Sequence, residues 1–168
     1  SLSIASNGDG VVSWIDGENY IILASTYIEG SWEPSPTTLS APLSYYPVSA
    51  ALDTGIFVSW QNLDSGQNQA IRYVEGSWEA VDDVSIDTPN SNPALSGATG
   101  LTFNAWVDYQ TGQVKVSEYG VTGTPSTPVV ISVGDTNNQQ SLASSAAITA
   151  AAWVSYSGID VNINASVN

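Results

Sequence analysis

The 168-residue chain has no cysteine, no histidine and no methionine, and only two basic residues stand against sixteen acidic ones. The lack of cysteine excludes disulfides, thiol nucleophiles and thiolate metal sites, and the lack of histidine removes the commonest transition-metal ligand. We therefore expect no metal site, no cofactor and no His-dependent or Cys-dependent catalysis. A formal net charge of −14 cannot neutralise a phosphate backbone, so nucleic acid is not an expected partner.

Long apolar runs are also absent. No stretch approaches the roughly 18 consecutive apolar residues of a membrane helix, so we expect no membrane insertion. Because the chain starts at Ser1 and has no methionine, we expect a processed product or an excised domain. Many Ser, Thr, Asn and Gln residues and few lysines favour a secreted or cell-surface protein. The length predicts a single domain over residues 1–168.

Tryptophan reveals an internal repeat of about 46 residues. Along the chain, 46, 46 and 47 positions separate Trp14, Trp60, Trp106 and Trp153. The same 46-residue spacing separates Tyr27, Tyr73 and Tyr119. A fixed period of this length is typical of repeat architectures in which each repeat is one supersecondary unit.

Each repeat predicts short β-strands joined by turns. Apolar, β-rich segments surround each of the four tryptophans, and turn sequences such as Asn7-Gly8-Asp9-Gly10 precede them. First strands are predicted at 2–6, 48–52, 94–98 and 141–145, third strands at 114–117 and 161–165, and fourth strands at 30–40 and 76–85. Four antiparallel strands per repeat are typical of a β-propeller blade.

We therefore predict an all-β fold, a β-propeller of four blades. The blades span about 1–46, 47–92, 93–139 and 140–168, and the last lacks its outer strand because the sequence ends at Asn168. The third strand of that blade would then be an open edge, with Val161, Ile163 and Ala165 alternating with asparagines. An open edge is a template for strand addition, so self-association through it is a second prediction.

The repeat unit resembles the blades of bacterial secreted and cell-surface β-propellers, a group that includes sialidase-like and lectin-like proteins. Trp14, Asp16, Tyr27, Gly30 and Trp32 carry this resemblance in the first repeat, and Trp60, Tyr73, Gly76, Trp78, Trp106, Asp108, Tyr119 and Trp153 carry it in the others. Asn62 and Ser155 replace the aspartate, and Thr124 replaces the second tryptophan of the third repeat. Since Arg72 is the only arginine, the arginine cluster of sialidases cannot form.

The repeated aromatic residues have two interpretations. The four second-strand tryptophans could stack on sugars, but a residue repeated at one place in every blade is what core packing requires, so we predict that they are buried. Trp32 and Trp78 are predicted to pack between adjacent blades.

Candidate ligand residues are predicted on the face that carries the loops between second and third strands. Asp16, Asn62 and Asp108 end second strands, where a turn cap is the alternative role. Tyr45 and Tyr46 lie in a predicted connection between blades, and Tyr109 and Tyr156 lie in loops on the same face. Rings, carboxylates and amides together suit a neutral carbohydrate or a peptide loop.

These observations favour a non-catalytic binding or assembly module of a secreted or surface protein, with carbohydrate or protein as its partner. The alternative is a structural or adhesive subunit that associates through the open edge of the last blade. A glycoside hydrolase is a third hypothesis, with Asp16 and Asp108 as the carboxyl pair. Equivalent repeat positions argue against it, because an acid and a base need two different pKa values.

Overall fold

The computed structural model describes residues 1–86, 90–98, 100–132, 137–145, 149–157 and 160–167, with side-chain environments given for 1–132, 140–145 and 149–154 within these ranges. The described chain is all-β and forms four antiparallel sheets. The strands are β1 (Leu2–Ile4), β2 (Gly10–Asp16), β3 (Ile21–Ile28), β4 (Ser31–Trp32), β5 (Thr37–Thr38), β6 (Ser44–Leu52), β7 (Gly55–Asn62), β8 (Asn68–Val74), β9 (Ser77–Trp78), β10 (Asp82–Asp83), β11 (Ala94–Ala98), β12 (Leu101–Asp108), β13 (Gln113–Gly120), β14 (Val129–Val130), β15 (Asn137–Ser144), β16 (Thr149–Ser157) and β17 (Asp160–Val167). Within the described residues, no helix is long and apolar enough to cross a membrane.

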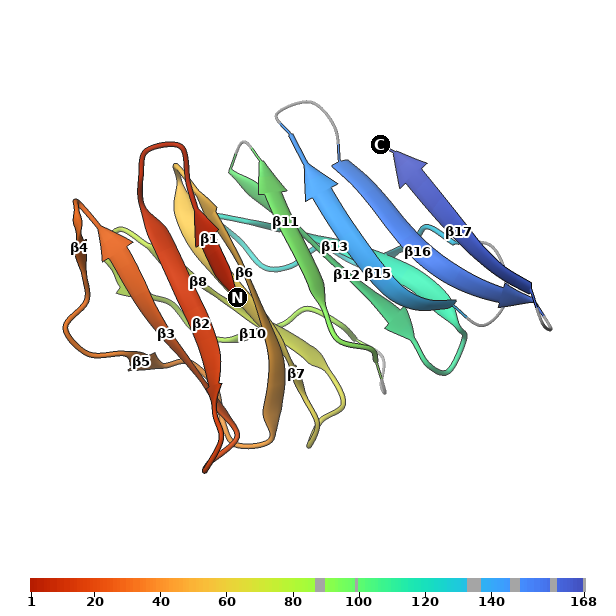
Figure 1. Ribbon diagram of the computed structural model, residues 1–168, viewed down its shortest axis with the longest axis horizontal. Coiled ribbons are helices and arrows are strands. Elements are labelled where there is room, and N and C mark those ends of the chain that lie inside the picture. The colour runs from red at the N-terminus through yellow and green to blue at the C-terminus, as the bar shows by residue number, and fades with distance from the viewer. Residues whose placement is uncertain (87–89, 99, 133–136, 146–148, 158–159, 168) are drawn as a thin grey trace.

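One sheet forms from each repeat. The first contains β1 to β5, the second β6 to β10, the third β11 to β14 and the fourth β15 to β17. In Figure 1 the sheets stand side by side in chain order, with the first sheet at one end of the row and the fourth at the other. The prediction of four sheets, with only three strands in the last, is therefore confirmed for the described residues.

The outer strands are shorter than predicted. Instead of one fourth strand over 30–40, the first sheet has two short strands, β4 and β5, on either side of residues 33–36. Each of them pairs with β3. Pro34 and Pro36 lie in this interval, and proline cannot donate a ladder hydrogen bond. The predicted strand over 76–85 is likewise reduced to β9 and β10.

Alternate residues of each second strand pack against the two neighbouring sheets. In β7, Trp60 packs with apolar residues of the first sheet, whereas Phe57 packs with residues of the third. In β12, Trp106 packs with residues of the second sheet and Val107 with residues of the fourth. Trp60, Trp106 and Trp153 therefore face the preceding sheet, and the residues one position before and after each of them lie on the opposite face of the strand.

The core-packing prediction is confirmed for Trp60, Trp106 and Trp153, whose exposed fractions are 0%, 1% and 7%. It is wrong for Trp14, which is 36% exposed, because none of the three clusters of described residues includes it. Trp32 fails for the same reason: it is 49% exposed and contacts only the ring of Tyr27, at 5.2 Å between centroids, among the described aromatic residues.

Three hydrophobic clusters hold the sheets together. They join the first sheet to the second, the second to the third and the third to the fourth. No such cluster of described residues joins the fourth sheet to the first, so closure of four blades around one axis stays a prediction.

The strand β6 begins earlier than predicted. Tyr45 belongs to the ladder opposite Gln61, and the ladder resumes at Val48 after a bulge. The bulge contains Pro47, which lacks the N–H that a regular ladder needs. Tyr45 and Tyr46 therefore lie at the start of a strand and not in a free connection between sheets.

Candidate ligand site at the loop face

The loops between second and third strands start with a turn that a side chain closes. The carboxylate of Asp16 accepts the backbone N–H of Glu18 at 3.1 Å. In the second sheet, Asn62 Oδ1 accepts the N–H groups of Asp64 and Ser65 at 2.9 and 3.2 Å. Such local bonds satisfy backbone donors that the turn leaves without ladder partners. The Asp or Asn at this repeat position therefore has a structural role.

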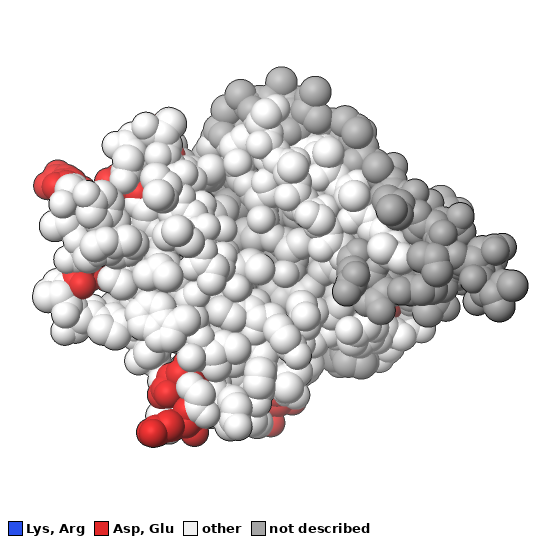
Figure 2. Space-filling model, viewed as in Figure 1, with Lys and Arg blue, Asp and Glu red and all other residues white. Residues whose placement is uncertain are grey.

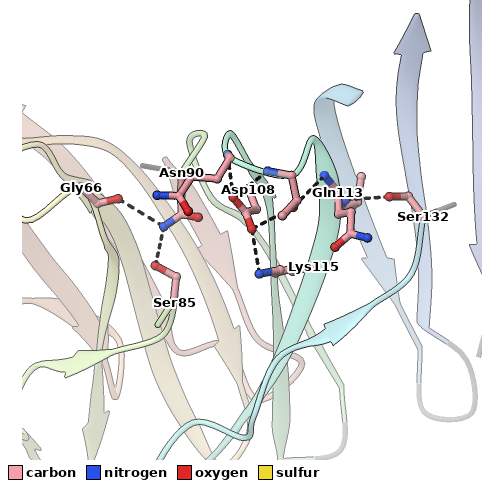
Figure 3. A network of polar contacts seen from close by, with 10 residues as sticks. Gly66, Ser85, Asn90, Asp108, Gln113, Lys115 and Ser132 are labelled. Atoms are coloured by element: carbon pink, nitrogen blue, oxygen red, sulfur yellow. Dashed lines mark hydrogen bonds and ion pairs between the residues drawn. The ribbon is translucent and has the colours of Figure 1, made fainter. Parts of the chain in front are cut away.

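Asp108 closes the equivalent turn of the third sheet from a buried position. Its carboxylate accepts the N–H groups of Gln110 at 2.8 Å and Thr111 at 3.3 Å and the hydroxyl of Thr111 at 2.9 Å. Lys115 Nζ lies 2.8 Å from Asp108 Oδ2, and the aspartate is 1% exposed (Figure 3). Burial raises the pKa of Asp108, but the hydrogen bonds from Lys115, Thr111 and Gln110 outweigh burial and lower it below its ordinary value.

The buried network continues into the second sheet. The side-chain amide of Asn90 donates to Gly66 O at 3.2 Å and to Ser85 Oγ at 2.9 Å, and Asn90 forms an isolated antiparallel bridge with Asp108 (Figure 3). These bonds tie the loop ends of the second and third sheets together. The network makes this end of the two sheets a rigid support.

Both candidate carboxylates have lowered pKa values. The amide of Asn19 and the N–H of Glu18 lower the pKa of Asp16. Both Asp16 and Asp108 are thus ionised at neutral pH, whereas glycoside hydrolysis by a carboxyl pair needs one protonated acid.

The two basic residues of the chain are both committed to internal contacts. Arg72 pairs with Glu79 and donates to the backbone oxygen of Gly120 at 2.8 Å, and its side chain is 10% exposed. Lys115 pairs with Asp108 and is 12% exposed. A surface ligand therefore meets carboxylates, amides and rings but no uncommitted cation, which favours a neutral ligand over an anionic one.

Three tyrosines form a continuous aromatic surface at the loop ends of the first two sheets. The rings of Tyr20 and Tyr45 stack with centroids 5.4 Å apart and planes inclined by 25°. Tyr46 follows, with its ring centroid 6.0 Å from that of Tyr45. Tyr20 and Tyr46 are 45% and 49% exposed. We call these three residues the tyrosine patch.

Backbone strain accompanies the tyrosine patch. Tyr20, Leu43 and Tyr46 have φ angles of 53°, 62° and 56°, a left-handed conformation that costs a non-glycine residue about 1–2 kcal/mol. Hydrogen bonds hold them in place, including Ser44 N–H to Tyr20 O at 2.8 Å and Leu63 N–H to Leu43 O at 2.8 Å. Strained residues that the surrounding structure fixes are often found at binding sites.

The structure separates the candidate residues into three groups. Tyr45 and Tyr46 come together with Tyr20, which sequence analysis missed although it directly follows the predicted turn at 16–19. Asn62 and Asp108 are buried, at 7% and 1% exposure, and therefore support the loops from below. Tyr109 is 56% exposed and has no ring partner among the described aromatic residues, and the side chain of Tyr156 lies outside the described residues.

The charge distribution places acids beside this site. In Figure 1 the loops after β2 and β7 lie at the lower ends of the sheets, and Figure 2 shows acidic side chains gathered at that end. The middle of the same face carries neither acidic nor basic side chains (Figure 2). Figure 2 also shows acidic side chains at the opposite end of the first sheets, so acids lie near the tyrosine patch but are not confined to its end of the molecule.

A cavity of about 430 Å³ lies between the third and fourth sheets, and Phe103, Val116, Leu142 and Ala151 are among its lining residues. Between the second and third sheets, the equivalent phenylalanine, Phe57, meets the ring of Tyr119 at 5.6 Å. One period after Tyr119, the fourth repeat has Ser166 in place of a tyrosine. This missing tyrosine is the feature of the sequence that indicates the cavity. The cavity therefore occupies the place that an aromatic ring fills in the neighbouring pair of sheets.

No protein-family model matches the chain, and no curated protein matches it either. Among solved structures, it is similar to an α-L-arabinofuranosidase from Podospora anserina in complex with cellotriose (TM-score 0.54, 11% identity, 99% of this chain and 62% of that one). It is also similar to the catalytic domain of a Coprinopsis cinerea GH62 α-L-arabinofuranosidase (TM-score 0.50, 11% identity, 95% and 60% covered). A third likeness is the Hadza microbial sialidase Hz136 (TM-score 0.56, 11% identity, 98% and 42% covered).

The chain spans about three-fifths of the two arabinofuranosidase chains and about two-fifths of the sialidase chain. The matched structures are five-bladed and six-bladed propellers, which have more blades than the four sheets described here. At 11% identity these likenesses establish the fold alone: an all-β, propeller-like arrangement similar to that of carbohydrate-active propellers.

Proposed function

We propose that this chain is a non-catalytic module of a secreted or cell-surface protein that binds a neutral carbohydrate at the tyrosine patch. The observation that carries the proposal is the partly exposed set of three adjacent rings, in which Tyr20 stacks on Tyr45 and Tyr46 is tilted against Tyr45 by 42°. Aromatic faces pack against the apolar C–H faces of sugars, and a phenol group adds a hydrogen bond at the ring edge. A peptide loop of a partner protein is the rival ligand at the same surface.

The surroundings of the tyrosine patch support a neutral sugar. The turn that precedes Tyr20 contains Asp16 and Asn19, whose oxygens and amide can bond to hydroxyl groups. Both cations of the chain are used in internal ion pairs, so a carboxylated sugar has no basic partner. The likeness in fold to an arabinofuranosidase solved with cellotriose is consistent with a carbohydrate ligand.

A glycan array followed by titration calorimetry tests this proposal. We expect the chain to bind at least one neutral glycan, and we expect Tyr46→Ala to raise its Kd about 10-fold because one stacking surface is removed. Tyr20→Ala should have a similar effect. Tyr109→Ala is the matched control, since Tyr109 is equally exposed but lies outside the patch.

Two results would reject the carbohydrate proposal. One is the absence of binding on a broad array and in calorimetry at millimolar glycan. The other is binding that Tyr109→Ala weakens as much as Tyr46→Ala, because the tyrosine patch would then contribute nothing special.

A second candidate function is assembly through the free edge of β17. Within the described residues β17 pairs only with β16, so one row of its backbone groups has no ladder partner. Positions 161, 163 and 165 are Val, Ile and Ala, without the charge or proline that usually protects an edge. An added strand would pair with this edge through the main chain.

Amide hydrogen exchange tests the edge. We expect slow exchange along 160–167 in native assemblies and fast exchange in the dispersed monomer, because added main-chain hydrogen bonds protect the amides. Fast exchange in both states would show that the edge stays bare.

A further inference from the structure

The outer face of the first sheet carries a cluster of apolar side chains outside the three core clusters of described residues, with Asp16 at its loop end. Register pairs Leu2 with Val12 and Ile4 with Gly10, so these side chains lie on the same face as Trp14. The exposed fractions of Leu2, Ile4 and Trp14 are 63%, 67% and 36%. Trp32 adds a further ring beside Tyr27. We call this surface the leading face.

The repeat shows what normally covers such a surface. Trp60, Trp106 and Trp153 occupy the position of Trp14 in the other three sheets, and each packs against the sheet before it. The covering residues in the preceding second strand lie three positions before its tryptophan, as Val11 and Phe57 do, or one position after it, as Ile15 and Val107 do. For Trp60 they include Val11 and Ile15 of the first sheet. The leading face is therefore shaped for the far face of another sheet of the same repeat.

The fourth sheet carries such a far face. Ala151 and Trp153 pack toward the third sheet, so the alternating residues Ala150, Ala152 and Val154 lie on the opposite side. Ala150 and Val154 occupy the covering positions identified above, Ala152 lies between them, and all three are apolar. Ala143, opposite Ala150 in β15, lies on the same side and is exposed. We call this surface the trailing face.

We infer that the leading face of one copy of this chain docks on the trailing face of a second copy. A second copy is the occupant because its trailing face presents apolar residues at the positions that cover the tryptophan of the next sheet within the chain. The contact is head-to-tail, since two different surfaces meet. Two copies joined at both junctions would bring together eight sheets, a number that propellers use.

Charge modulates this association without specifying it. Apart from Asp16, the named residues of both faces are uncharged, whereas each chain carries a net charge of −14 that repels its copy. Salt screens this repulsion and leaves the apolar contact intact. Added sodium chloride should therefore strengthen the dimer, whereas a contact made by ion pairs would weaken.

Light scattering across a dilution series of the 168-residue chain tests the inference. We expect the mass to rise from 17.5 kDa toward twice that value as concentration increases. Trp14→Glu in the leading face and Ala152→Glu in the trailing face should each raise the dimer Kd about 100-fold, because a charge would be buried at the junction. Tyr109→Glu, which places a charge outside both faces, should leave the mass unchanged.

Mixing the two variants provides the decisive measurement. An equimolar mixture of Trp14→Glu and Ala152→Glu should recover dimers, because the intact trailing face of the first variant meets the intact leading face of the second. Circular dichroism checks that both remain folded. Leu2→Glu and Ala143→Glu, at exposed positions of the same faces, replace either variant if it unfolds.

Three results would overturn the inference. A wild-type chain that stays at 17.5 kDa at every concentration would show that the two faces do not dock between copies. If the Trp14→Glu and Ala152→Glu variants remain dimeric, the contact between copies lies outside the leading and trailing faces, and the edge of β17 is the next candidate. Variants that are monomeric alone and in the mixture would show that an intact leading face and an intact trailing face do not dock. None of these results depends on glycan binding, so this inference and the proposed function can fail separately.

Discussion

Replacing Trp60 by alanine is expected to lower the free energy of unfolding by about 3–5 kcal/mol. The side chain is fully buried between the first two sheets, in contact with the cluster that includes Val11, Ile22 and Val58. A cavity of this size cannot collapse, because strands of two hydrogen-bonded sheets surround it. The substitution also removes the indole N–H that donates to Gln69 at 3.3 Å. Urea unfolding followed by circular dichroism measures the loss.

The matched control is Trp14→Ala, the same substitution at the same repeat position. Trp14 is 36% exposed and has no covering sheet in the monomer, so its removal leaves no closed cavity. We expect a loss below about 1 kcal/mol when the measurement is made at concentrations where the chain is monomeric. Equal losses for Trp60→Ala and Trp14→Ala would mean that Trp14 is also buried, as in a closed four-bladed ring.

The comparison of these two tryptophans shows what the sequence could and could not reveal. A 46-residue period predicts that equivalent residues adopt equivalent strands, and it located all four sheets correctly. The period does not show which sheets have a neighbouring sheet on both faces. Trp14 and Trp32 were therefore predicted to be buried, although burial depends on a neighbour that the first sheet lacks. The same reasoning succeeded for Trp78, which packs against the first cluster.

The candidate site was predictable in part. Its position at the loop ends follows from strand order, and Tyr45 and Tyr46 are candidates because the repeat places them in a connection between blades on that face. Tyr20 was missed because its ring reaches Tyr45 only after the first two sheets pack together. Likewise, sequence alone could not separate Asp16 from Asp108, since their different exposures arise from the packing of the third sheet on the second.

Replacing Asp108 by alanine is expected to cost about 3–5 kcal/mol of unfolding free energy. The substitution leaves the ammonium of Lys115, which is 12% exposed, without its carboxylate partner. It also removes the acceptor for the N–H of Gln110 and the hydroxyl of Thr111 in the turn. Asp16→Ala is the control at the equivalent position, and its loss should be much smaller because that carboxylate has no ion pair and is solvated.

A double substitution separates the ion pair from the turn. Asp108→Asn can still accept turn N–H groups, as Asn62 does in the second sheet, but it removes the carboxylate that pairs with Lys115. Adding Lys115→Met removes the buried charge as well. We expect the double variant to be more stable than Asp108→Asn alone, because a buried pair replaced by neutral groups costs less than a broken pair. A double variant no more stable than the single one would indicate that the ion pair is unimportant.

The pH dependence of unfolding provides an independent measurement of the same pair. Because the pKa of Asp108 is lower in the folded chain than in the unfolded chain, the unfolded state binds more protons in acid, so stability rises with pH. The contribution of Asp108 is present above its unfolded pKa of about 3.9 and is lost as the pH falls through its folded pKa. Acidification also relieves repulsion among the sixteen acidic residues, so the informative quantity is the difference between two proteins. The stability of the wild type should fall more steeply below about pH 4 than that of the Asp108→Asn/Lys115→Met variant, and parallel curves would contradict a lowered pKa at Asp108.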